Sequence, residues 1–129
     1  MAVRRLTVSG RAPADLVWER YARPALWTSW SPQIRGVGVD AERIAPGVCG
    51  LVRGPLGLGV RFEIVAVDEA ARTWSWRIAL RLATLDLHHS VTKTENGSTT
   101  TLTIDGSVPL VLGYLVPARL ALGRLVAAP

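Results

Sequence analysis

The run Asp15-Leu-Val-Trp-Glu-Arg-Tyr-Ala-Arg-Pro-Ala-Leu-Trp-Thr-Ser-Trp-Ser-Pro32 holds four of the chain's eight aromatic residues. Trp18 and Tyr21 are three residues apart, so they would share one face of a helix. A proline then interrupts that helix, and Trp27 and Trp30 begin a second pattern with the same spacing. The run therefore predicts two short helices that meet at a corner and close one end of a hydrophobic core.

Alternating apolar and polar residues on both sides of this corner predict an antiparallel sheet. One strand precedes the corner, at residues 3–9, and six follow it, the first two at residues 34–39 and 47–53. A glycine-rich loop at residues 54–59 comes next. The inner faces of the last four strands are expected to carry Val60, Phe62, Ile64 and Ala66; Trp74, Trp76, Ile78, Leu80 and Leu82; Leu85, Leu87, His89 and Val91; and Thr100, Leu102, Ile104 and Val108.

The C-terminal segment, residues 109–125, is apolar and runs for ten residues before its first charge, Arg119. A membrane helix needs about twenty apolar residues. We therefore expect no integral membrane segment but a buried helix, interrupted by Gly113 and Pro117, that covers the apolar face of the sheet. The fold class is α+β, and no linker or repeat marks a second domain within residues 1–129.

Composition excludes several classes of function. The net charge is +5, and every basic residue except Lys93 is an arginine, but these arginines are scattered, so nucleic-acid binding is not expected. The single cysteine, Cys49, allows no internal disulfide, and the N-terminus lacks a signal-like apolar run. These features predict a cytoplasmic protein. The short, apolar C-terminal helix could complete its burial against a second copy, which predicts a homodimer.

Several local runs resemble the SRPBCC superfamily, also called the START or Bet v 1-like helix-grip fold, and in particular its bacterial polyketide cyclase/dehydrase-like branch. They are Ala12-Pro-Ala-Asp-Leu-Val-Trp18, Trp27-Thr-Ser-Trp-Ser-Pro32, Val65-Ala-Val-Asp-Glu-Ala-Ala-Arg-Thr-Trp-Ser-Trp76, His89-Ser-Val-Thr-Lys-Thr-Glu-Asn-Gly97 and the apolar C-terminal helix. The resemblance implies a curved sheet that grips the long C-terminal helix around a hydrophobic cavity. It also implies a small hydrophobic ligand, since members carry lipids, sterols, plant hormones or polyketides.

The leading hypothesis is therefore binding of a polyketide-, aromatic- or lipid-like molecule in an internal cavity. The expected ligand-binding residues are aromatic side chains from the corner, the inner sheet face and the last helix: Trp27, Trp30, Phe62, Trp74, Trp76 and Tyr114. Trp18 and Tyr21 are expected to be structural, and core packing without ligand contact is the alternative for Trp27, Trp30, Trp74 and Trp76. A third hypothesis is an interaction module whose vestigial cavity is filled by its own tryptophans.

An enzyme of the polyketide cyclase or dehydratase type is the alternative. His89 is its candidate catalytic residue, because strand parity turns it inward and histidine is the usual acid or base near neutral pH. The competing interpretation is a structural histidine bonded to a carbonyl or hydroxyl. No Gly-x-Ser-x-Gly run, phosphate loop or zinc-like cysteine spacing is present. We expect no metal and no cofactor.

Overall fold

The computed structural model describes residues 2–54, 58–80 and 83–128. β1 (Ala2–Gly10) is followed by the helical corner, which consists of α1 (Ala14–Ala22), the 3₁₀ turn η1 (Pro24–Leu26) and α2 (Trp27–Trp30). Six more strands and one long helix complete the chain: β2 (Gly36–Val39), β3 (Cys49–Arg53), β4 (Gly59–Asp68), β5 (Thr73–Ala79), β6 (Thr84–Thr94), β7 (Gly97–Gly106) and α3 (Val108–Leu125).

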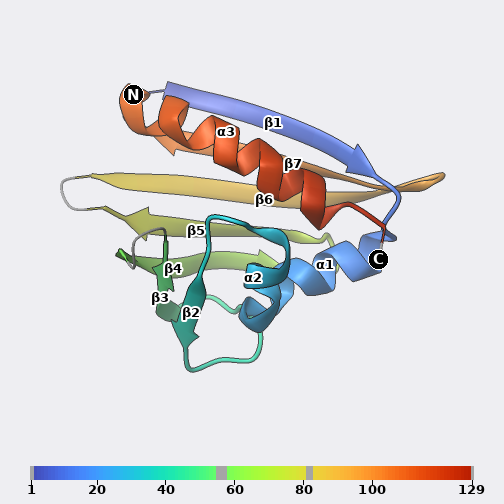
Figure 1. Cartoon of the computed structure of the whole chain (residues 1–129). Coiled ribbons are helices and arrows are strands. Elements are labelled where there is room, and N and C mark those ends of the chain that lie inside the picture. Colours follow the sequence, from blue (N-terminus) through green and yellow to red (C-terminus); the bar gives the residue numbers. More distant parts are fainter. Residues whose placement is uncertain (1, 55–57, 81–82, 129) are drawn as a thin grey trace.

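The seven strands form one antiparallel sheet in the order β1-β7-β6-β5-β4-β3-β2. Figure 1 shows the sheet curving around α3, with α1 and α2 gathered at the end of the molecule where α3 finishes. This is the helix-grip architecture that the sequence predicts. The two short helices, the six strands after them and the long last helix are all confirmed.

Two glycines allow the end of α3 to close against the end of β1. A Cβ on Gly10 would lie 2.1 Å from the carbonyl oxygen of Val126, and one on Gly97 would lie 2.0 Å from that of Gly10. The amide of Ala12 donates a 3.0 Å hydrogen bond to the Val126 carbonyl. A side chain at Gly10 would push β1 away from the end of α3, and one at Gly97 would push β7 away from β1. The two glycines therefore fix where the last helix ends.

The inner face of the sheet departs from the sequence prediction at two residues. A β-bulge between Ile64 and Ala66 turns Ala66 outward, and it is exposed instead of sharing the face of Ile64. Val108 does not continue the last strand but begins α3, and it is 44% exposed. Leu82 and residues 55–57 of the glycine-rich loop lie outside the described residues.

α3 differs from the expected helix in two ways. It continues through Gly113 and Pro117 without a break, although Pro117 cannot donate to the carbonyl of Gly113. Only five of its eighteen residues are buried, because a single helix laid on β1 and β7 has one face toward the core. Among the described helices, α3 alone is long and apolar enough to span a membrane. We interpret it as the grip helix, since its buried face packs on the sheet.

Candidate ligand-binding site

An apolar cavity lies between the sheet and the N-terminal half of α3. Its volume is about 330 Å³, within the usual range for small-molecule sites. α3 packs mainly on β1 and β7, so the inner faces of β3, β4 and β5 remain free to form the opposite wall. We call this region the open end. It is lined by Gln33, Ile34, Val52, Gly54, Val60, Phe62, Trp76, Ile78, Leu80, Leu85, Pro109, Leu110, Gly113 and Tyr114.

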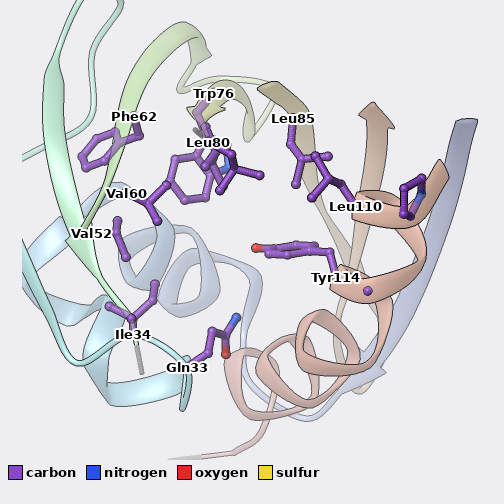
Figure 2. A pocket seen from close by; sticks show the side chains of 14 residues that line it. Gln33, Ile34, Val52, Val60, Phe62, Trp76, Leu80, Leu85, Leu110 and Tyr114 are labelled. Atoms are coloured by element: carbon purple, nitrogen blue, oxygen red, sulfur yellow. The ribbon is translucent and has the colours of Figure 1, made fainter. Parts of the chain in front are cut away.

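Polar groups are rare in this lining, and no charged side chain of the described residues belongs to it. Figure 2 shows the Tyr114 ring extending from α3 with its hydroxyl inside the cavity, above Gln33 and facing Val60 and Trp76. Burial raises the pKa of Tyr114 to about 12, and the Gln33 amide acts in the opposite direction. The phenol therefore stays neutral at physiological pH. The cavity suits an uncharged, apolar molecule.

A second group of rings fills the other end of the interior, beneath α1 and α2. This closed end consists of Tyr21, Trp27, Trp30, Trp74 and His89, all buried. Trp74 stacks on His89 with ring centroids 4.6 Å apart, and Tyr21 meets His89 edge-on at 4.8 Å. The remaining void is about 20 Å³, enough for a single water at most.

The corner tryptophans have a backbone partner that explains their positions. A helix leaves its last four carbonyls without partners inside the helix. In α1, the indole N–H of Trp30 donates to the Arg20 carbonyl at 3.0 Å, and that of Trp27 donates to the Tyr21 carbonyl at 2.8 Å. Backbone amides satisfy the other two carbonyls, Glu19 from Arg23 and Ala22 from Ile44. Trp27 and Trp30 thus cap the C-terminus of α1 with their side chains.

His89 is held by a hydrogen-bond chain whose direction is fixed at both ends. The Trp76 indole N–H, which can only donate, lies 3.0 Å from His89 Nε2. His89 Nδ1 must then carry the proton and donate to the Tyr21 hydroxyl at 3.0 Å. Tyr21 in turn donates to Thr100 Oγ1 at 2.6 Å, and Thr100 donates to the Ser90 carbonyl at 3.1 Å. Both ring nitrogens of His89 are therefore occupied.

This environment keeps His89 neutral. Burial, with a smaller contribution from the neighbouring His88, lowers the pKa of His89 to about 3. A proton added at Nε2 would also face the Trp76 N–H and break that bond. A histidine that stays neutral and fully bonded has no proton to exchange with a ligand at neutral pH, so the geometry favours its structural interpretation.

Ion pairs hold the closed end from outside. The Arg43 guanidinium lies 2.7 Å from a Glu19 carboxylate oxygen on α1 and 2.9 Å from one of Glu69 after β4. The hydrogen bond from Arg43 lowers the pKa of Glu19. The indole N–H of Trp18 also donates to Glu69. These contacts join α1 to the turn between β4 and β5. The described residues that line the open end include no charged side chain, so they form no comparable ion pair.

The structure thus divides the residues that the sequence proposed for one site. Phe62, Trp76 and Tyr114 line the open-end cavity, whereas Trp27, Trp30, Trp74 and His89 surround the small void of the closed end. Trp76 and Tyr114 line both spaces, as do Gln33 and Ile34, and these side chains form the wall between them. Sequence reasoning missed Gln33, Val52 and Leu110 as lining residues. The first is an isolated polar residue in a loop, which no pattern singles out.

Metal-binding groups do not gather in the part of the chain that the structure describes. Within residues 2–54, 58–80 and 83–128, no three His, Cys, Asp or Glu side chains are placed to share an ion. Of the two histidines, His88 is exposed, as expected from strand parity, and its Nδ1 pairs with the Ser75 hydroxyl at 2.6 Å. That the chain uses neither metal nor cofactor stays a prediction.

Comparison with known sequences places this fold and cavity in a family. The family described as "Polyketide cyclase / dehydrase and lipid transport" matches residues 1–128. The chain belongs to this family. The match confirms the resemblance that the sequence runs indicate, and membership supports binding of hydrophobic ligands in general. No curated protein sequence gives a significant match to the chain.

Solved structures confirm the Bet v 1-like fold of this family member. Ara h 8.0201 superposes with a TM-score of 0.77 at 13% sequence identity, over 96% of this chain and 94% of its own. The major latex-like protein 151 of Panax ginseng gives a TM-score of 0.76 at 16% identity, over 99% of this chain and 98% of its own. At these identities the likeness concerns the fold.

Proposed function

We propose that this protein binds an uncharged, hydrophobic small molecule, polyketide-, aromatic- or lipid-like, in the open-end cavity. The observation that carries the proposal is a cavity of about 330 Å³ whose lining is apolar except for Gln33, Tyr114 and the indole of Trp76. That indole N–H is already engaged with His89. An interaction module whose cavity is filled by its own tryptophans would match the closed end only. In the open end, the aromatic side chains leave the cavity unfilled.

A cavity-blocking variant tests this proposal. Gly113 lines the cavity on α3, and a Cβ built there meets nothing within 4 Å outside its own helix. Gly113→Leu should therefore place a side chain in the cavity space without a backbone clash. Gly123→Leu is the matched control, because Gly123 lies on the same helix, is equally free of contacts and does not line the cavity. Both variants gain the same helix propensity.

Binding is measured by the fluorescence of N-phenyl-1-naphthylamine, an uncharged apolar probe that brightens in apolar surroundings. Wild type and Gly123→Leu should bind it saturably with equal affinity, and Gly113→Leu should lose at least about tenfold in affinity. Absence of saturable binding to wild type, or equal binding by Gly113→Leu, would contradict the proposal.

The alternative function, a cyclase or dehydratase that uses His89, stays a prediction with weaker support. His89 lies outside the open-end cavity, and its ring nitrogens bond Trp76 and Tyr21. An enzyme of this kind would lose turnover but keep ligand affinity in His89→Gln. If turnover of a polyketide substrate is found and the variant retains it, the acid/base role of His89 is excluded.

The predicted homodimer and cytoplasmic location remain predictions. A dimer would use the exposed ridge of α3, where Leu112 and Val116 are 49% and 70% exposed and Val108 and Leu120 extend the row at intervals of four. Gel filtration at micromolar concentration should then give twice the monomer mass. The double variant Leu112→Ser/Val116→Ser should elute at the monomer mass. A wild-type monomer would contradict the prediction.

A further inference from the structure

Two polar groups meet in the otherwise apolar cavity, and one of them lacks a partner. Gln33 Oε1 is buried and accepts no hydrogen bond from any described residue. Figure 2 shows the Gln33 amide below the Tyr114 hydroxyl, with the hydroxyl directed into the cavity. Gln33 comes from the loop after α2 and Tyr114 from α3, so two separate elements bring the pair together.

A buried acceptor without a donor is rare in folded proteins and calls for an explanation. In the orientation that Figure 2 shows, Oε1 points away from Tyr114, so a molecule bound in the open-end cavity can bring the missing donor only when the amide turns Oε1 toward the cavity. The amide of Gln33 presents its nitrogen toward Tyr114 in Figure 2, and a half-turn about its last bond exchanges Nε2 and Oε1 without changing its shape. In the turned orientation, Gln33 offers Oε1 to a ligand in the cavity.

We propose that Gln33 and Tyr114 recognise a single hydroxyl on an otherwise apolar, uncharged ligand. The inference rests on the proposed function and names its ligand class. A hydroxyl both accepts and donates, so it can take the proton of the Tyr114 phenol and give its own to Gln33 Oε1. A carbonyl can only accept and leaves Oε1 unpaired. A methyl group satisfies neither.

Charge is excluded by the same lining. No arginine, lysine or histidine of the described residues lines the cavity, so a carboxylate would be buried without a counter-ion. Tyr114 remains protonated because burial raises its pKa to about 12, and it therefore keeps the proton that the ligand oxygen accepts. Gln33 and Tyr114 therefore recognise an uncharged oxygen of the ligand, and a hydroxyl oxygen in particular.

Three probes of one shape test this assignment: 2-naphthol, 2-naphthaldehyde and 2-methylnaphthalene, each competing with bound N-phenyl-1-naphthylamine. We expect affinity to fall in that order, with 2-naphthol about tenfold above 2-methylnaphthalene, the effect of one hydrogen bond to a buried group. Tyr114→Phe and Gln33→Met should each bring the ratio close to one. Tyr21→Phe removes the same atom from the closed end and should leave the ratio unchanged.

The outcomes separate the two proposals. If 2-methylnaphthalene competes but 2-naphthol is no better, the hydroxyl assignment is wrong and hydrophobic binding stands. An aldehyde that equals or exceeds the alcohol also overturns it, since Gln33 Oε1 then plays no part. If none of the three competes and N-phenyl-1-naphthylamine itself fails to bind, the proposed function fails, and this inference fails with it.

Discussion

The two ends of the interior are built from similar residues but differ in how much space their side chains leave unfilled. In the closed end, the indoles of Trp27 and Trp30 donate to carbonyls of α1 and His89 bonds at both nitrogens, while the buried indole N–H of Trp74 has no partner among the described residues. In the open end, Gln33 Oε1 has no partner among the described residues, and about 330 Å³ is unfilled. Aromatic content and an unpaired polar atom occur at both ends, so neither marks a ligand site by itself, and the unfilled volume is what distinguishes the open end.

The largest predicted effect is in the closed end. Trp27→Ala removes a ring that is 1% exposed together with the N–H that caps the Tyr21 carbonyl. Truncation of a buried tryptophan costs about 3–5 kcal/mol, and the unpaired carbonyl adds to that cost. Chemical denaturation should show a loss in this range. A loss below about 1 kcal/mol would mean that the closed end is not the tightly packed region described above.

The pH dependence of stability tests the neutral state of His89. Its folded pKa of about 3 lies below the usual value of 6.5, so the unfolded chain binds the extra proton between these values. Stability is complete above pH 6.5 and falls as the pH decreases, by about 2 kcal/mol between pH 7 and pH 5. Urea denaturation at several pH values measures this slope.

His89→Gln should flatten the slope over the same pH range, whatever its effect on absolute stability. His88→Gln is the matched control, because His88 is exposed and stands outside the Trp76–His89–Tyr21 chain. If wild type shows no slope, or if His88→Gln removes it and His89→Gln does not, the assignment of His89 as a buried neutral group is wrong.

The smallest effect is expected in the open end. Val60→Ala enlarges a cavity that already exists, so it should destabilise the free protein by less than about 1 kcal/mol. Val17→Ala makes the same chemical change at a fully buried position of α1 and should cost about 2 kcal/mol. Thermal unfolding of both variants gives the comparison. Equal losses would remove the distinction between the ends.

Sequence periodicity predicted which side chains point inward but not which end they fill. Strand parity correctly turned Trp74, Trp76 and His89 toward the core. It missed the bulge at Ala66, because residues 64–67 are all apolar and no alternation is left to break. The indole N–H groups of the corner are committed to carbonyls of α1, a contact that depends on how the helices pack and leaves no periodic signal.

Methyl NMR shows which end of the interior binds a ligand, because it reports on both ends in one experiment. Protein labelled at valine and leucine methyls is titrated with N-phenyl-1-naphthylamine. We expect saturable shifts at Val52, Val60 and Leu110 of the open end, and little change at Val17, which is buried on the inner face of α1. Leu102 and Leu122, beside the closed-end void, should also stay in place. Shifts centred on Leu102 and Leu122, or no saturable shift at all, would contradict this expectation.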